Sequence, residues 1–218
     1  MEELNTIQRI SIWLLPVLLA ITVHEVAHGW MAKKLGDKTA EMMGRLTLNP
    51  LKHIDPVGTL LVPGFLMLVG GFIFGWAKPV PITWENLKNP RRDVALVALA
   101  GPISNFIMAL FWALAMKIGM LLSASIGAWV FPLVLMGSAG VTINLILMAL
   151  NLLPILPLDG GRVVSAILPG KLSYQFAKLE PYGLFIILGL FFFGGLSWLL
   201  SPPVNMLRDI IHALVGLH

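Results

Sequence analysis

Long apolar runs dominate this chain and limit what it can fold into. Five runs approach or exceed the ~20 residues that a helix needs to cross a bilayer, and they lie at about 8–34, 57–75, 94–119, 129–156 and 181–200. Hydrophobic residues make up 57% of the 218 residues and charged residues only 12%, which is far from soluble globular usage. The sequence therefore predicts one membrane-embedded domain over residues 1–218, an all-α polytopic membrane protein.

Charge and cysteine content exclude several classes of function. The formal net charge is +4, and the basic residues lie in loops between apolar runs, a distribution that follows membrane topology rather than a nucleic-acid surface. We expect a lipid bilayer around the helices and no nucleic-acid partner. The chain contains no cysteine, so any metal ligand must be His, Asp or Glu.

An H-E-x-x-H motif, His24-Glu25-Val26-Ala27-His28, lies within the first apolar run. Residues four apart share a helix face, so His24 and His28 can offer imidazole nitrogens to one Zn²⁺ while Glu25 reaches a metal-bound water. No charged residue occurs from 10 to 23, and ionisable groups are costly enough in hydrocarbon to indicate a functional site. A pair of core histidines, with Glu25 bonded to a basic partner, is the alternative.

A catalytic zinc site needs a third protein ligand and a position left for water, and Asp159 is the best candidate. It ends the segment Asn151-Leu152-Leu153-Pro154-Ile155-Leu156-Pro157-Leu158-Asp159 and precedes two glycines. The prolines interrupt a helix and the glycines free the backbone, so the carboxylate can turn into the protein. An ordinary aspartate in a turn is the alternative.

Two asparagines on this helix are candidate substrate-binding residues. Asn151 lies at the unwound helix end before Asp159, where its amide can stabilise an oxyanion. Asn144 lies seven residues earlier on the same face and extends the polar stripe into the membrane, although hydrogen bonding between helices is the more common use of such a residue. Asn105, whose Gly-Pro neighbours favour close helix packing, is interpreted in the same way.

The distribution of basic residues predicts the topology. They follow both of the first two apolar runs, as Lys33, Lys34, Lys38, Arg45 and Lys52, and then Lys78, Lys88, Arg91 and Arg92. Because cytoplasmic loops are rich in Lys and Arg, both loops are cytoplasmic if 57–75 enters the membrane and returns. Its Pro63-Gly64 and Gly70-Gly71 breaks suit such a re-entrant element. We expect four transmembrane helices plus this element, with a fifth span as the alternative.

Helix geometry then predicts the depth of the metal site. At about 1.5 Å per residue, His24 lies ~21 Å along a helix that enters near Ile10, which leaves ~9 Å of a ~30 Å hydrocarbon core. In the four-span topology the helix before Asp159 emerges on the same side. The site should therefore be shallow and on the cytoplasmic side.

Two peripheral elements are predicted as well. The alternating pattern from Arg45 to Pro50 favours a small β-hairpin within 40–56. After Pro202-Pro203, the residues Leu207, Ile210, Ile211 and Leu214 fall at helical spacing. They predict an amphipathic interfacial helix over 203–217.

Three motifs in this order resemble the site-2 protease family of intramembrane zinc metalloproteases, especially its compact bacterial and archaeal members. They are H-E-x-x-H at 24–28, Gly101-Pro102-Ile103-Ser104-Asn105, which is similar to the family's G-P-x-x-N, and N-x-x-P-x-x-P-x-D-G-G at 151–161. Together they cover most of the predicted core, residues 8–162. The resemblance implies that His24, His28 and Asp159 bind Zn²⁺, that Glu25 is the catalytic carboxylate, and that the substrate is a transmembrane helix. It also supports Asn151 as a contact to the substrate backbone.

We therefore expect a zinc-dependent intramembrane endopeptidase, in a prokaryotic plasma membrane, that cuts in or near transmembrane segments of membrane proteins. A divalent-metal transporter or sensor would also carry His and Asp in membrane helices, but it would need a polar path and no Glu25. A membrane-anchored zinc protease acting on surface-exposed tails shares H-E-x-x-H but usually draws its third ligand from a downstream Glu. No oligomeric state is predicted.

Overall fold

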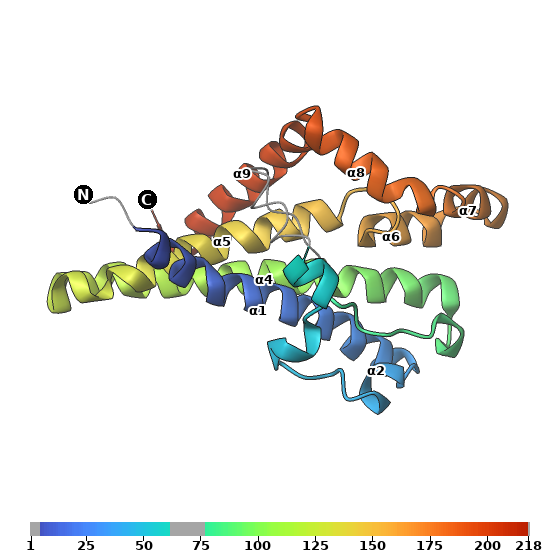
Figure 1. Cartoon of the computed structure of the whole chain (residues 1–218), viewed down its shortest axis with the longest axis horizontal. Helices are drawn as coiled ribbons and strands as arrows, with labels where there is room; N and C mark the ends of the chain where they lie inside the picture. Colours follow the sequence, from blue (N-terminus) through green and yellow to red (C-terminus); the bar gives the residue numbers. More distant parts are fainter. Residues whose placement is uncertain (1–4, 62–76, 218) are drawn as a thin grey trace.

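The fold is a bundle of long helices (Figure 1). The computed structural model describes residues 5–61 and 77–217, and within these ranges every regular element is a helix or a helical turn. Three helices form the body, α1 (Thr6–Leu35), α4 (Pro90–Ile126) and α5 (Phe131–Asn151), and each packs against the other two. Since α4 runs antiparallel to α1 and α5, the C-terminal ends of α1 and α5 share one end of the bundle with the start of α4 (Figure 1).

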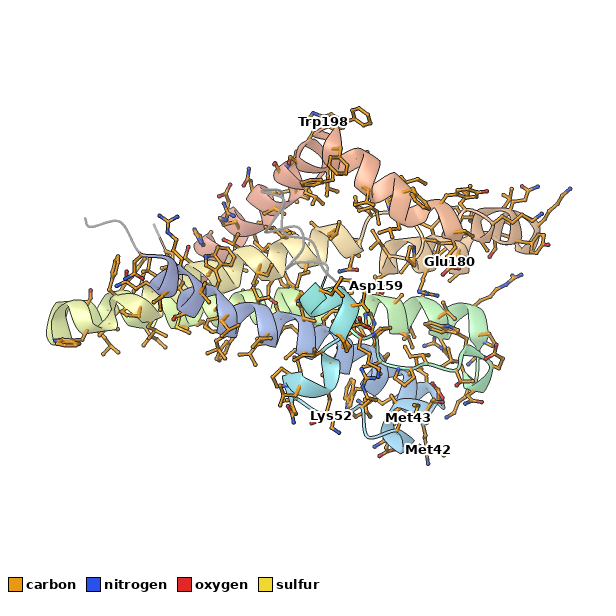
Figure 2. All side chains as sticks on the ribbon, viewed as in Figure 1. Met42, Met43, Lys52, Asp159, Glu180 and Trp198 are labelled. Atoms are coloured by element: carbon orange, nitrogen blue, oxygen red, sulfur yellow. The ribbon has the colours of Figure 1, made fainter. Side chains whose placement is uncertain are left out.

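Four stretches of the described chain are long and apolar enough to cross a membrane, in agreement with the predicted number of spans. They are Ile7–Leu35, Pro90–Ser123, Phe131–Asn151 and Gly170–Phe192. Large apolar side chains such as Ile107 and Phe111 on α4 are exposed on the exterior of the bundle. Trp198, near the start of the last helix, is exposed as well (Figure 2). An exterior of this kind suits lipid rather than water, and the chain is an integral membrane protein.

Small residues let the helices of the body approach closely. A Cβ built on Gly140 of α5 would lie only 2.2 Å from the Trp112 ring of α4, so this contact requires glycine. The same core takes in Leu145 of α5 and Ile211 of the last helix, α9 (Gly195–Val215). Close approach through small residues is the usual way in which helices associate in a bilayer, where there is no water to expel.

The segment between α1 and α4 leaves the bundle and returns to it at the same end. The N–H of Lys88 donates to the Leu35 carbonyl at 3.2 Å, and that of Lys78 donates to the His53 carbonyl at 2.9 Å. The two basic loops therefore lie together, as the charge pattern predicts. Of the predicted re-entrant element, 62–76 lie outside the described residues, so its path through the membrane stays a prediction.

The predicted β-hairpin within 40–56 is wrong, because this stretch is described throughout and contains no strand. It forms two short helices instead, α2 (Thr39–Met42) and η1 (Pro50–His53), followed by the start of η2 (Pro56–Leu61). Asn49 accepts a hydrogen bond from the Leu51 N–H at 3.0 Å. This local turn chemistry prevails over the alternating pattern.

The predicted span at 181–200 has the wrong boundaries. Helix α8 (Gly183–Phe192) ends before Gly194, whose φ of +74° lies in the left-handed region that favours glycine, and α9 begins directly after it. The apolar stretch extends instead toward the N-terminus, through α7 (Gly170–Ala177) and the short η5 (Glu180–Tyr182). A glycine bend in the apolar run therefore shifts the span by about half its length.

The C-terminal helix also differs from the predicted one. It does not begin after the two prolines but continues through Pro202 and Pro203, and its buried residues Val204, Ile211 and Val215 join the core of α4 and α5. Part of the face predicted to lie at the membrane interface is thus covered by protein. Leu207 also packs partly against this core, whereas Ile210 and Leu214 are exposed.

Candidate metal centre

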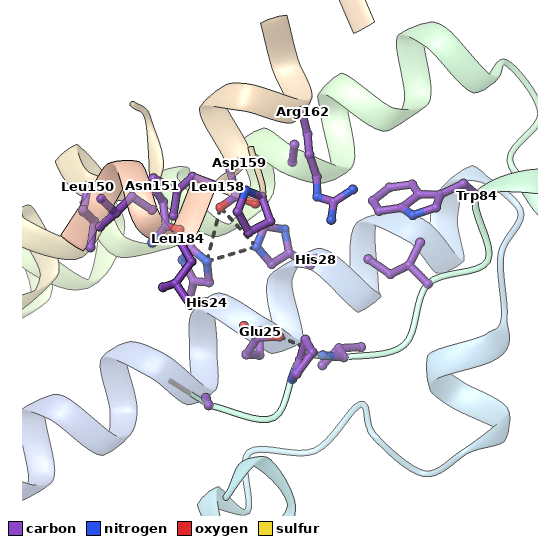
Figure 3. A pocket seen from close by; sticks show the side chains of 17 residues that line it. His24, Glu25, His28, Trp84, Leu150, Asn151, Leu158, Asp159, Arg162 and Leu184 are labelled. Atoms are coloured by element: carbon purple, nitrogen blue, oxygen red, sulfur yellow. Dashed lines mark hydrogen bonds and ion pairs between the residues drawn. The ribbon is translucent and has the colours of Figure 1, made fainter. Parts of the chain in front are cut away.

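His24 and His28 lie one turn apart on α1 and face Asp159 at the start of α6 (Asp159–Ile167) (Figure 3). Their Nε2 atoms are 3.0 Å apart, and the Asp159 Oδ2 atom lies 3.3 Å from His24 Nε2 and 3.4 Å from His28 Nε2. All three residues are buried. The structure therefore brings together the three predicted ligands in a spacing that can hold a metal ion.

The hydrogen bonds around the histidines leave their Nε2 atoms available to a cation. His24 Nδ1 lies 2.6 Å from the Asn105 Oδ1 atom, and His28 Nδ1 lies 2.8 Å from the Val97 carbonyl. Oxygen acceptors require an N–H at Nδ1, so in the neutral rings both Nε2 lone pairs face the carboxylate. Among the described residues, Asp159 Oδ2 has no hydrogen-bond donor. Two histidines and an aspartate arranged in this way fit Zn²⁺ with a further position for water.

Asp159 reaches the histidines because the chain turns sharply after α5. The segment 152–158 contains a cis Leu156–Pro157 bond, and α6 begins at Asp159. A Cβ on Gly160 would lie 2.2 Å from the Leu152 carbonyl oxygen, and one on Gly161 2.5 Å from the Ile155 carbonyl carbon. Both glycines are needed for the turn to fold back on itself, which explains the two glycines after the ligand.

A glycine on α4, whose role is not evident from the sequence alone, makes room for the candidate metal ligands. A Cβ built on Gly101 would lie 2.4 Å from His28 Nε2 and 2.5 Å from His24 Cε1. Only hydrogen fits between α4 and the two rings at this point. Gly101 is the first residue of the G-P-x-x-N motif, and the sequence alone indicates for its Gly-Pro pair a role in close helix packing.

Asn105 and Asn144 form a buried chain of hydrogen bonds that leads away from the metal site. Asn105 contacts His24 through its oxygen, and its Nδ2 donates to Asn144 Oδ1 at 2.9 Å and to the Ala20 carbonyl at 3.2 Å. Asn144 Nδ2 in turn donates to the Gly140 carbonyl. The structure thus does not bring Asn144 into the pocket, because its amide is fully buried and committed to α4 and α5.

Replacing Asn105 with Ala is expected to weaken zinc binding about 10- to 100-fold, the range typical of lost hydrogen bonds to a metal-binding histidine. His24 would lose the acceptor that fixes its ring and tautomer. Competition with a chelator in detergent measures the affinity. Asn205→Ala, at an exposed position of α9, is the matched control and should bind zinc like the wild type. Equal weakening in both variants would refute this role.

Glu25 lines the same pocket as the ligands, which encloses about 600 Å³. Its Oε2 atom accepts a hydrogen bond from the N–H of Val80 at 2.8 Å, so the carboxylate is held on the side of the 77–86 segment (Figure 3). We call this segment the strap. The strap contributes Pro79, Val80 and Trp84 to the pocket wall. No sequence motif indicated these residues, because the path of the backbone beside α1 brings them to the pocket.

Asn151 and Arg162 also line the pocket. The Asn151 Nδ2 atom donates to the Leu147 carbonyl at 2.9 Å, and within the described part of the chain the side-chain oxygen of Asn151 accepts no hydrogen bond. The Arg162 guanidinium stacks 5.2 Å from the centre of the Trp84 ring and lies 3.5 Å from Glu180 Oε1. Arg162 therefore joins α6 to the strap beside the pocket.

A buried His, His, Asp site beside a glutamate, on helices long enough to cross a bilayer, defines a membrane-embedded zinc metalloprotease. The sequence profile of Peptidase family M50 matches residues 12–124 and 116–192. The chain belongs to this family, the site-2 proteases.

Three relatives illustrate the similarity. YwhC of Bacillus subtilis is 38% identical over 203 residues, which cover 89% of this chain and 86% of YwhC. Rip2 of Mycolicibacterium smegmatis is 30% identical over 196 residues, covering 86% of this chain and 66% of Rip2. Zinc metalloprotease MJ0392 of Methanocaldococcus jannaschii is 25% identical over 158 residues, or 72% of this chain and 34% of MJ0392. No solved structure matches the chain.

These similarities and the metal site decide between an enzyme and a metal transporter or sensor. The protein is an enzyme, a zinc-dependent intramembrane endopeptidase, and not a metal transporter or sensor. Zinc is its cofactor.

Proposed function

We propose that His24, His28 and Asp159 hold the zinc ion and that Glu25 is the catalytic carboxylate for cleavage of peptide bonds in or near transmembrane segments of membrane protein substrates. The convergence of three buried ligand atoms next to Glu25, in one pocket between membrane-long helices, carries this proposal. His24 and His28 lie on α1 and Asp159 lies at the start of α6, shortly after α5 ends, which supports a site within the membrane domain rather than on an appended one.

The residues of the pocket suggest how the reaction proceeds. His24, His28 and Asp159 would hold the zinc ion, which would lower the pKa of water and polarise the scissile carbonyl. Glu25 takes one proton from the attacking water and returns it to the leaving amine, so that water adds across the C–N bond without an acyl-enzyme. The Val80 N–H holds Oε2 of this glutamate in place. Asn151 is the candidate donor to the substrate carbonyl oxygen.

We infer that the active site faces the cytoplasmic side of a prokaryotic plasma membrane. Most basic residues of the described chain occur in the segments at the end of the bundle where α1 and α5 finish, whereas Arg9, Lys117 and Arg208 belong to the segments near the other end. Lys and Arg are enriched on the cytoplasmic side of membrane proteins. The ligand His24 lies nearer to the basic end of α1 than to its N-terminus.

A substrate helix must unwind before its peptide bonds can reach the pocket, because an intact helix engages them in hydrogen bonds. Proline is about 3 kcal/mol less favourable than alanine inside a helix. Placing a proline near the cleavage site of a single-span substrate should therefore speed cleavage by up to roughly 100-fold. Purified enzyme and substrate are reconstituted in liposomes, and the products are mapped by mass spectrometry.

The same assay tests where the enzyme cuts. We expect cuts within the half of the substrate span near its cytoplasmic end. A substrate with the proline in a soluble tail should be cleaved at the same rate as the substrate without the added proline. If the enzyme cut only in the tails, whatever the sequence of the span, the proposed substrate class would be wrong.

A further inference from the structure

The strap, residues 77–86, determines where the catalytic carboxylate lies. It runs along the pocket without regular structure until the short helix η3 (Trp84–Asn86), and the N–H of its Val80 donates to Glu25 Oε2 at 2.8 Å. A displacement of the strap would therefore move or release Glu25.

Two buried charged side chains from the segment after α1 hold the strap on either side of Val80. The Arg45 guanidinium donates to the carbonyls of Lys78 and Pro79, at 2.9 and 3.4 Å. Asp37 accepts a hydrogen bond from the Thr83 N–H at 2.9 Å. Val80 lies between these two attachments, so its amide is fixed from both directions.

Asp37 is the stronger of the two anchors, because donors surround its carboxylate. Its side chain is 0% exposed. It accepts local hydrogen bonds from the Thr39 N–H and hydroxyl, and long-range ones from the Thr83 N–H and from the Asn86 Nδ2 atom at 3.0 Å. Burial alone would raise the pKa of Asp37, but hydrogen bonds from Thr39, Asn86 and Thr83 outweigh burial and hold this pKa below its ordinary value. The carboxylate is thus ionised at neutral pH.

The local and the long-range hydrogen bonds of Asp37 have different consequences. The two bonds from Thr39 are sufficient for the turn that begins α2. The bonds from Thr83 and Asn86 cross 46 and 49 residues of sequence, and they attach only the strap. A residue needed merely to end α1 would not require them.

We propose that Asp37 is a positioning residue for peptide hydrolysis, acting on Glu25 through the strap and the Val80 amide. The inference rests on the proposed role of Glu25 as the catalytic carboxylate. Asp37 contacts neither the metal ligands nor the pocket. Its loss should therefore lower the rate of the chemical step and leave the metal site intact.

Asp37→Asn tests the proposal, because the substitution keeps the size of the side chain and turns an amide NH₂ toward at least one of the donors. We expect kcat to fall about 10- to 100-fold, as for other small misplacements of catalytic groups, with KM changed less than about twofold, since substrate binding is untouched. Zinc affinity and the visible spectrum of the cobalt-substituted protein should match the wild type. Hydrogen exchange should rise in peptides covering the strap and not in those covering α1.

Glu41→Gln is the matched control, because Glu41 is an exposed residue of α2 whose carboxylate, among the described residues, pairs with Lys33 alone. It should leave kcat, KM and exchange of the strap unchanged. If the Asp37→Asn protein does not accumulate, Asn86→Ala provides the test, because it removes one long-range donor to Asp37 at an exposed position. We then expect kcat to fall about fivefold, which corresponds to the free energy of one hydrogen bond, about 1 kcal/mol. The proposal would be overturned if either variant kept the wild-type kcat, or if its loss of activity matched a loss of bound zinc. Absence of cleavage by the wild type and Glu41→Gln would instead refute the proposed function.

Discussion

The Glu25→Gln variant is expected to bind zinc as the wild type does and to lose at least ~10²–10⁴-fold of its peptide-hydrolysing activity, the usual contribution of a general base. The three converging ligand atoms come from His24, His28 and Asp159, so Glu25 is not needed to hold the ion. A glutamine has the same shape and its oxygen can still accept the Val80 N–H. It cannot take a proton from water, so only the chemistry should fail.

Zinc content and proteolysis must be measured on the same preparation to test this prediction. Metal is counted by elemental mass spectrometry after purification in detergent, and cleavage of a single-span substrate is followed in liposomes. The control is Glu41→Gln, in which an exposed carboxylate is removed and both values should match the wild type. Loss of zinc from the Glu25→Gln protein would indicate that Glu25 is a metal ligand. Full activity of this variant would mean that another group transfers the proton.

The sequence could predict that the three candidate ligands lie together, because the geometry that joins them is mostly local. Helical spacing alone puts His24 and His28 on one face of α1. Asp159 required one further inference, that prolines and glycines turn the chain at the end of α5. The structure agrees, since α6 begins at this aspartate. Short-range rules were sufficient for the candidate site wherever its members lie within one helix or one turn.

Asn144 shows where helical periodicity stops being informative. Its seven-residue spacing from Asn151 correctly indicates a shared face of α5, but the same face meets the pocket at one end and α4 at the other. Asn144 is buried against Asn105, whereas Asn151 lines the pocket. Periodicity identifies the face of a helix and not the neighbour that covers it.

The strap and its anchors could not be found from the sequence for a related reason. Asp37 and Arg45 look like ordinary charges in a basic loop, and the alternating residues after Arg45 favour a strand. Their partners, Thr83 and Lys78, lie 46 and 33 residues away along the chain. These contacts depend on the return of the chain to the end of α1, and no local pattern reports that return.

The boundaries of the C-terminal helices were missed because hydrophobicity does not reveal a bend. The run at 181–200 is apolar throughout, yet the left-handed Gly194 separates α8 from α9 within it. Conversely, Pro202 and Pro203 look like a helix start but lie inside α9. Glycine and proline indicate where a helix can bend or begin, and the packing of α9 on α4 and α5 decides which of these occurs.

Gly101→Ala should weaken zinc binding strongly, although it adds a single methyl group. That methyl would lie 2.4 Å from His28 Nε2 and 2.5 Å from His24 Cε1, inside van der Waals contact distance. The rings cannot turn away, because Asn105 and the Val97 carbonyl hold their Nδ1 atoms. Overpacking a tight site costs about 1–3 kcal/mol, so with the ligand atoms themselves displaced we expect zinc affinity to fall by roughly 100-fold or more.

The control for this substitution is Gly189→Ala in α8, where a Cβ would meet nothing within 4 Å. Both changes add one methyl group to a helical glycine, so any difference between them comes from what the methyl contacts. Gly189→Ala should keep wild-type zinc content and activity, whereas Gly101→Ala should lose both while retaining its helical circular dichroism. Wild-type zinc affinity in Gly101→Ala would mean that α4 can move away from the histidines, and the fit of the site would then not depend on this glycine.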